Sequence, residues 1–121
     1  MQLEARKYLF DIRQACALLA KFTAGKSLAD YASDDLLRSA IERQFEISGE
    51  ALNKLLKVEP SMAAAITDSK RIISFRNVLI HGYATISNEA VWTIVEKNLP
   101  VLHREVAQLL LAGADPEIGR T

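Results

Sequence analysis

Four side chains capable of phosphate chemistry lie within a short stretch of this 121-residue sequence. They are Arg76, Asn77, His81 and Tyr83, and the residues between them are apolar or glycine. A histidine titrates near neutral pH and can transfer protons, whereas a guanidinium binds phosphate oxygens through a planar pair of donors. Together these groups could cleave a phosphodiester without a metal ion, with Asn77 orienting the imidazole or the phosphate.

The elements around these residues decide which of them can meet. The sequence pattern from residue 70 to 80 predicts a helix that ends at Gly82, a residue suited to a left-handed cap. Around a regular helix Arg76 and His81 lie about 140° apart, whereas Asn77 and His81 share a face. Arg76 can meet an imidazole either by swinging its long stem around the helix or across a dimer of two such helices. We favour the dimer.

The rest of the chain carries apolar residues at three- and four-residue spacing, which is typical of amphipathic helices. The expected helices cover residues 3–22, about 34–58, 70–80 and 91–113, with a capped turn after Ser27 and a short helix at 62–66. Ser33 is the expected N-cap of the second long helix. With no alternating strand pattern, the predicted fold is all-α, an up-and-down bundle of four to five helices.

A proline interrupts the last of these helices. Pro100 removes one backbone donor and leaves the carbonyl of Glu96 without its α-helical partner, so we expect the helix to be kinked at Pro100. The length suits one domain, which we assign to residues 1–113, and residues 114–121 are expected to form a loose C-terminal tail.

Composition excludes several classes of protein. Lys plus Arg and Asp plus Glu both total 15, so any contact with RNA must be local. The only cysteine, Cys16, allows no internal disulfide and no cysteine-rich zinc site, which fits a reducing cytoplasm. The N-terminal residues mix charged and apolar side chains, so we expect neither a signal peptide nor a membrane span.

The spacing of Arg76, His81 and Tyr83 resembles the signature of HEPN-superfamily ribonucleases, an arginine followed after four residues by histidine and then by a tyrosine two positions later. The surrounding sequence is similar to the HepT branch, the toxin of a two-gene, type VII-like toxin–antitoxin system with a minimal nucleotidyltransferase. The similar stretches are residues 8–12, 43–51 and 91–100, so the resemblance covers nearly the whole chain.

The resemblance implies an all-helical endoribonuclease toxin that acts as a homodimer and needs no cofactor. Arg76 and His81 would be the catalytic residues, cleaving single-stranded RNA by attack of a ribose 2′-hydroxyl on the adjacent phosphate, with Asn77 in support. Tyr83 resembles the tyrosine to which the partner nucleotidyltransferase, the antitoxin, transfers AMP. A bulky anionic group there would block the cleft.

Two other functions are compatible with the sequence. The balanced charge favours a non-catalytic helical module that binds a nucleotide or docks a nucleotidyltransferase, and periodicity alone also allows a plain dimerisation scaffold. Glu46 and Glu50 lie one helical turn apart, but with no histidine beside them they are a weak metal signal, so we expect a structural role such as pairing with Arg76. Trp92 is expected to be a core or interface anchor rather than a base-stacking platform.

Overall fold

The computed structural model describes the backbone of residues 1–82 and 86–120, and the side chains of these residues as far as Gly113. Within these ranges the chain forms helices joined by turns, with no β-strand. In chain order the elements are α1 (Leu3–Thr23), α2 (Leu28–Ser33), α3 (Asp35–Val58), the 3₁₀ helix η1 (Pro60–Ala64), α4 (Ser69–His81), α5 (Asn88–Thr93), the π-helical turn η2 (Ile94–Asn98) and α6 (Leu99–Arg120). The predicted all-α fold class is confirmed.

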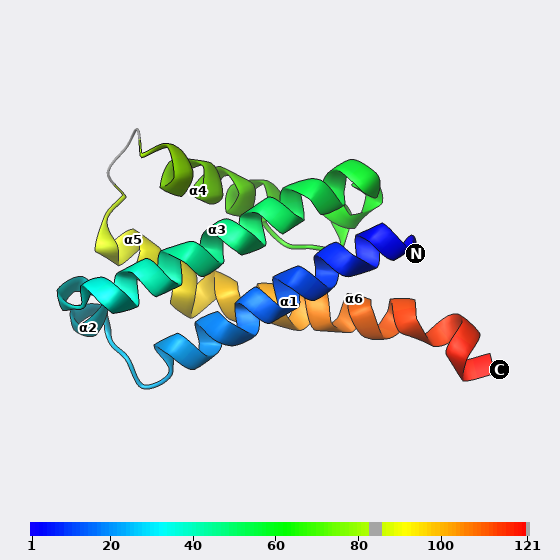
Figure 1. The fold of residues 1–121 in the computed structure, drawn as a ribbon, viewed down its shortest axis with the longest axis horizontal. Helices are drawn as coiled ribbons and strands as arrows, with labels where there is room; N and C mark the ends of the chain where they lie inside the picture. The colour runs from blue at the N-terminus through cyan, green and yellow to red at the C-terminus, as the bar shows by residue number, and fades with distance from the viewer. Residues whose placement is uncertain (83–85, 121) are drawn as a thin grey trace.

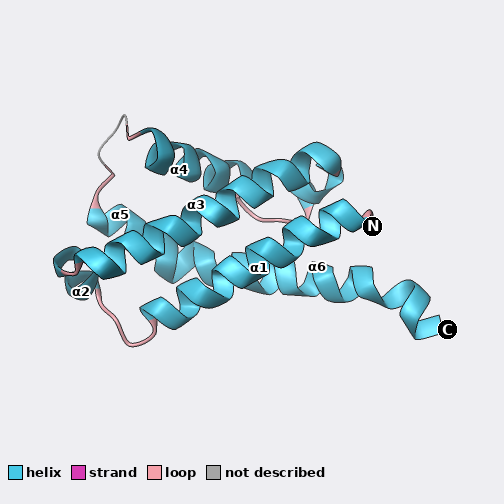
Figure 2. Cartoon of the chain, viewed as in Figure 1, coloured by secondary structure: helices cyan, strands magenta, loops and turns pink. Residues whose placement is uncertain are grey.

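Successive long helices run in opposite directions, so that both ends of the chain lie at the same end of the bundle (Figure 1). The short α2 and the η1 segment occupy the turns between them (Figure 2). α1 packs against α3 and α6, and α3 packs in turn against α4. The predicted up-and-down bundle is therefore the observed arrangement, with α3 between α1 and the helix that carries Arg76.

The first helix is buried through one apolar row. Its buried residues are Ala5, Leu9, Ile12, Ala15, Cys16 and Leu19, which follow the spacing of one helical face. Each of the large aliphatic side chains stabilises the fold by about 1.5–3 kcal/mol relative to an exposed position. The helix ends at Thr23, and Gly25 then adopts a φ of 72°, where a residue with a Cβ would be strained.

The connection between α2 and α3 is defined by caps. Ser27 and Asp30 form a reciprocal capping box at the start of α2. The N-cap of α3 is Asp34, whose side chain accepts a hydrogen bond from the N–H of Leu37. The predicted N-cap, Ser33, is wrong by one residue: it is the last residue of α2, and its hydroxyl donates to the carbonyl of Ala29 at 2.8 Å instead.

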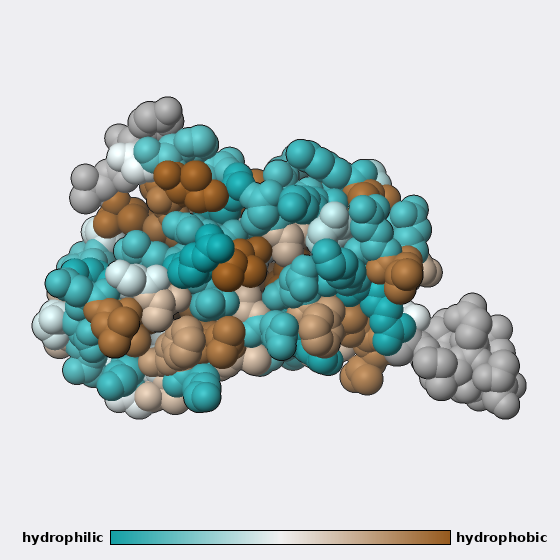
Figure 3. Space-filling view, viewed as in Figure 1, coloured by the Kyte–Doolittle hydropathy of each residue, from teal (hydrophilic) through white to brown (hydrophobic). Residues whose placement is uncertain are grey.

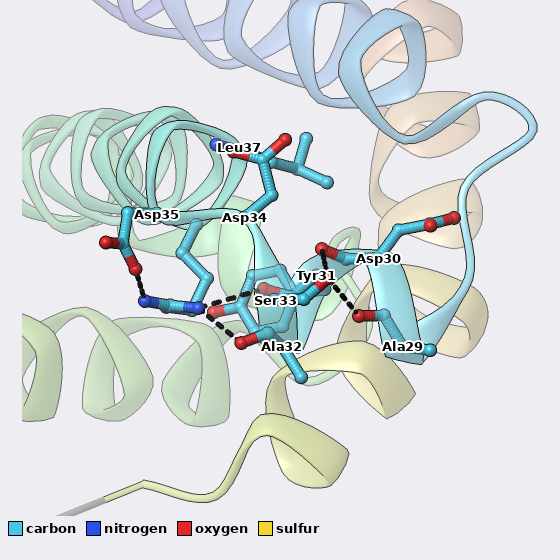
Figure 4. A network of polar contacts seen from close by, with 9 residues as sticks. Ala29, Asp30, Tyr31, Ala32, Ser33, Asp34, Asp35 and Leu37 are labelled. Carbon is cyan, nitrogen blue, oxygen red and sulfur yellow. Dashed lines mark hydrogen bonds and ion pairs between the residues drawn. The ribbon is translucent and has the colours of Figure 1, made fainter.

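Arg38 links the two helices on either side of this connection. Its Nη1 donates to the carbonyl oxygens of Ala32, at 2.6 Å, and Tyr31, at 3.3 Å, both near the C-terminus of α2. Its Nη2 forms an ion pair with Asp35 in the first turn of α3 (Figure 4). One guanidinium therefore satisfies carbonyl groups that the end of a short helix leaves without backbone donors.

In the middle of α3, small residues break the apolar row. Ser48 is fully buried, and its hydroxyl donates to the carbonyl of Phe45 at 3.1 Å, so the polar atom is satisfied within the helix. Gly49 is also buried. Phe45 packs edge-on against Phe75 of α4, with ring centroids 5.2 Å apart. The small residues Ser48 and Gly49 thus allow α4 to pack close to α3 at this level of the bundle.

Pro100 alters the helix in the turn that precedes it. The N–H of Leu99 donates to the carbonyl of Ile94, five residues earlier, as in a π-helix. Pro100 is then the second residue of α6, and the carbonyl of Glu96, which would accept from an N–H at this position in an α-helix, lies inside η2. The predicted irregularity therefore takes the form of η2. α6 also continues past Gly113, the predicted end of the helix, to Arg120.

Trp92 belongs to the core. Its side chain is buried and its ring lies 5.7 Å, centroid to centroid, from that of Tyr31, which joins α5 to α2. The preference for a core anchor over a base-stacking platform is confirmed. None of the helices in the described ranges is both long and apolar enough to span a membrane.

Candidate functional site

Arg76 lies where α4 passes close to α3. The contact point on α3 is Gly49: a Cβ at that position would overlap the Cβ of Arg76 and come within 2.8 Å of its Cγ. No side chain other than hydrogen fits between the two helices there. Gly49 therefore permits the approach of α4 that carries the Arg76 side chain along α3.

The guanidinium of Arg76 is held by two neighbouring groups. Its Nη2 forms an ion pair with Glu50 of α3, and its Nη1 donates to the amide oxygen of Asn77 at 2.7 Å. The other carboxylate oxygen of Glu50 lies 3.8 Å from Nζ of Lys54, one turn further along α3. Of the two carboxylates for which pairing with Arg76 was expected, Glu50 forms the pair, whereas Glu46 pairs with Arg43 at 3.4 Å.

This arrangement leaves Arg76 able to bind an anion. The side chain is 19% exposed, and its buried Nε has no hydrogen-bond partner among the described residues. A guanidinium carries five N–H donors, of which Glu50 and Asn77 each take one on a terminal nitrogen. The remaining terminal donors can still contact a phosphate, while the carboxylate and the amide fix where the guanidinium lies.

His81 is the last residue of α4 and is exposed. The helix is continuous from Ser69 to His81, and Gly82 ends it with a φ of 63° while donating its N–H to the carbonyl of Val78. Gly82 is thus the predicted left-handed cap. Because α4 is regular, the separation of about 140° between Arg76 and His81 applies, and the two residues leave the helix on different faces.

The structure therefore joins only part of the predicted site. It brings Arg76 and Asn77 together and adds Glu50, and it keeps Asn77 and His81 on one face of α4, four residues apart. Tyr83, the predicted position of AMP transfer, lies outside the described residues. Among the described residues, no three His, Cys, Asp or Glu side chains gather closely enough to hold a metal ion.

One residue of the site, Gly49, was not singled out from the sequence. A glycine inside an otherwise strong helical pattern lowers helix stability by about 1 kcal/mol relative to alanine, so its presence points to a packing requirement. That signal is present in the sequence, but the partner helix and the residue that needs the space can be identified only from the tertiary structure.

Comparison with known proteins agrees with this architecture. A sequence profile of the family described as "Ribonuclease HepT-like" matches residues 12–109, most of the helical bundle. The matched range includes Arg76, Gly49 and Glu50. No solved structure is similar enough to the chain to count as a match.

Several proteins of known sequence are similar to the chain over most of their length. A protein of Caldanaerobacter subterraneus that is provisionally named an RNase is 32% identical over 105 residues, covering 87% of this chain and 93% of its own. One of Methanocaldococcus jannaschii, also provisionally named an RNase, is 26% identical over 85% of this chain and 94% of its own. A protein of Thermococcus cleftensis named a probable ribonuclease HepT is 26% identical, over 90% of this chain and 98% of its own.

Proposed function

Since the chain belongs to the HepT-like ribonuclease family, we propose that it is a metal-independent endoribonuclease that acts on RNA in the cytoplasm as a toxin. Arg76 and His81 are its catalytic residues, and Asn77 supports them. The observation that carries the proposal is the guanidinium of Arg76, which is held by Glu50 and Asn77 with terminal donors still available to a phosphate.

The residue types suit cleavage through the ribose 2′-hydroxyl. In this step the 2′-oxygen forms a bond to the adjacent phosphorus as its proton passes to a base, and the bond to the 5′-oxygen breaks as that oxygen receives a proton. The products are a 2′,3′-cyclic phosphate and a 5′-hydroxyl. His81 transfers the protons, and Arg76 stabilises the charge that develops on the phosphate oxygens.

The active unit we propose is a dimer. Arg76 faces α3 and reaches Glu50, whereas His81 leaves the exposed end of α4 on another face. A second copy that packs along α4 would set the imidazole of one chain beside the guanidinium of the other. The two imidazoles of the dimer would then supply the acid and the base. An active monomer would contradict this part of the proposal.

RNA cleavage in excess chelator tests the proposed reaction. We expect the purified protein to release 2′,3′-cyclic phosphate ends, and both His81→Ala and Arg76→Ala to abolish that release. His103→Ala and Arg104→Ala are the matched controls, because these residues lie on α6 and should leave cleavage unchanged. A folded dimer that binds ATP and cleaves no RNA would instead favour a nucleotide-binding module.

Regulation by AMP transfer is a separate part of the proposal. A partner nucleotidyltransferase acts as the antitoxin by transferring AMP from ATP to the phenolic oxygen of Tyr83, with release of pyrophosphate. Coexpression with such a partner should add AMP-sized increments to the intact mass and stop RNA cleavage. Tyr83→Phe should block both effects, and an unchanged mass after coexpression would contradict this mode of control.

A further inference from the structure

A cavity of about 250 Å³ lies between α1 and α3, and a residue of α4 forms part of its wall. We call it the α1–α3 cavity. Its lining consists of Tyr8, the apolar residues Ile47, Ala51 and Ile80, the cations Lys7, Arg43 and Lys54, and the carboxylates Asp11, Glu46 and Glu50. On the face of the molecule in Figure 3, apolar patches alternate with polar side chains over these helices. The reaction proposed above does not use this space.

The cavity begins at the Arg76 site. Glu50 lines the cavity and also forms the ion pair with Arg76, so one carboxylate separates the guanidinium from this space. Ile80 follows Arg76 by four residues in α4 and therefore lies on the same face of the helix. A phosphate bound at Arg76 would have this cavity directly beside it.

The walls combine a flat aromatic surface with cations. The ring of Tyr8 is half-buried, and the side chains of Ile47 and Ile80 provide apolar surface. The ammonium group of Lys7 lies 5.7 Å from the centre of the Tyr8 ring. Aromatic rings that accept a stacked base next to cations that contact the backbone are the usual means of binding single-stranded nucleic acid.

The cations around the cavity are paired only weakly. Arg43 lies 3.4 Å from Glu46 with its side chain 68% exposed, and Lys54 lies 3.8 Å from Glu50 with its side chain 52% exposed. Ion pairs this exposed contribute little stability, so a phosphate can take either cation from its carboxylate at small cost. Because the three cations of the lining are matched by three carboxylates, an RNA strand can bind here only by exchanging these exposed ion pairs for contacts with its phosphates.

From these observations we propose that the α1–α3 cavity binds the unpaired nucleotide next to the phosphate held by Arg76. Its base stacks on Tyr8 against the wall formed by Ile47 and Ile80, displacing Lys7 from the ring. Lys7, Arg43 and Lys54 then contact the backbone phosphates. The inference deepens the proposed function, because it rests on Arg76 as the phosphate site and adds the position at which the neighbouring base binds.

Binding of a short RNA to a protein that cannot cleave it tests the cavity. The protein carries His81→Ala, and the probe is a fluorescent RNA tetranucleotide with 2′-O-methyl groups. Tyr8→Leu removes the aromatic ring and should weaken binding at least about fivefold, the lower end of what stacking of one base contributes. Tyr8→Phe keeps the ring and should bind as the parent protein does.

Phe10→Leu is the matched control for Tyr8→Leu. Phe10 lies on the same helix, is 44% exposed, and does not line the cavity, so the same loss of an aromatic ring should leave binding unchanged. If Tyr8→Leu also left binding unchanged, or if Phe10→Leu weakened it equally, the cavity would not be the binding site. Circular dichroism of each variant shows whether it remains folded.

A photo-crosslink locates the base directly. Tetranucleotides that carry 4-thiouridine should crosslink to the tryptic peptides 8–13 and 44–54, which contain Tyr8 and Ile47. Crosslinks confined to other peptides would overturn the proposal. The proposal would also be overturned if Tyr8→Leu dissociated the dimer and left the affinity for RNA unchanged. Tyr8 would then contact a second copy of the chain, and that copy would cover the cavity.

These measurements separate the two proposals. Tyr8-dependent binding and crosslinking without RNA cleavage in the His81-containing protein would leave the nucleotide site standing and reject the ribonuclease. Cleavage that depends on His81 but not on Tyr8, with crosslinks elsewhere, would do the reverse.

Discussion

Two arginines of this protein hold helices together, and they do so at very different ranges. Arg38 pairs with Asp35 and donates to the carbonyls of Tyr31 and Ala32, so all of its partners lie within seven residues along the chain. Arg76 pairs with Glu50, which is 26 residues away on another helix. Each guanidinium has two kinds of acceptor. Only the Arg76 pair, however, depends on how two helices far apart along the chain pack against each other.

The surroundings of the two pairs differ as much as their range. The side chain of Asp35 is 92% exposed, whereas that of Glu50 is 39% exposed and that of Arg76 only 19%. The Arg38 cluster completes a helix end and has a structural role. The Arg76 pair lies over a glycine and next to the α1–α3 cavity, so here the same chemistry positions the guanidinium that we propose binds phosphate.

The largest effect on this comparison is expected from Gly49→Ala. The new methyl group would overlap Arg76 and force α3 and α4 apart, so we expect a loss of about 1–3 kcal/mol in the free energy of unfolding. RNA cleavage should fall about a hundredfold or more, because displacements of about 1 Å at a catalytic group cost that much. Urea unfolding and cleavage rates measure the two effects.

Gly113→Ala is the control for this substitution. A Cβ at Gly113 would meet only the flexible end of Met1, at 2.6 Å from its Cε, which can move away at little cost. Stability and cleavage should both stay close to the parent values. If Gly49→Ala behaved like Gly113→Ala, the close approach of α3 and α4 would not be what positions Arg76.

A smaller effect is expected from neutralising the carboxylate partner of each arginine. Glu50→Gln keeps an oxygen that can accept from Arg76 but removes its charge, so kcat for RNA cleavage should fall about tenfold with little change in KM. Stability should fall by about 1 kcal/mol at most, since Glu50 is more than a third exposed.

Asp35→Asn makes the same chemical change at Arg38. The exposed pair there should contribute no more than about 0.5 kcal/mol, and cleavage should be unchanged. If Glu50→Gln lowers kcat and Asp35→Asn does not, Arg76 has a role in the site that Arg38 lacks. Equal effects on kcat would contradict this distinction between the two arginines.

The last effect is one of pH on stability, and it concerns the helix that Arg38 caps and the core beneath it. Burial raises the pKa of Cys16 to about 12, and burial followed by the nearby carboxylate of Glu42 raises that of Tyr31 to about 12. Both groups ionise more readily in the unfolded chain, from their ordinary pKa values of 9.0 and 10.0. Stability is therefore complete below pH 9 and decreases as the pH rises towards 12.

Between pH 7 and pH 10 this effect should lower the free energy of unfolding by about 1–2 kcal/mol. Urea unfolding at the two pH values measures the change, and Cys16→Ala should remove most of it because the cysteine ionises first. Rapid modification of Cys16 by a thiol reagent at pH 9 in the folded protein would contradict the burial on which the prediction rests.

The helices could be predicted largely because their signals are local. The apolar row of α1, the capping box at Ser27 and the cap at Gly82 depend on neighbours within about one turn. Where two local signals compete, the prediction was less accurate: Ser33 and Asp34 can both cap α3, and the carbonyl of Ala29 takes the serine hydroxyl. Pro100 likewise indicated an irregular turn but not its π-helical form.

The sequence by itself determined the all-helical bundle, the regular helix that sets Arg76 and His81 on different faces, and the motif that identifies the family. Only the tertiary structure decided that Arg76 lies over Gly49, that Glu50 rather than Glu46 is its partner, and that a cavity lined by Tyr8 opens beside the pair. The physical reason is range. Helix periodicity and caps act between neighbours in sequence, whereas the position of a guanidinium depends on contacts between helices that are far apart along the chain.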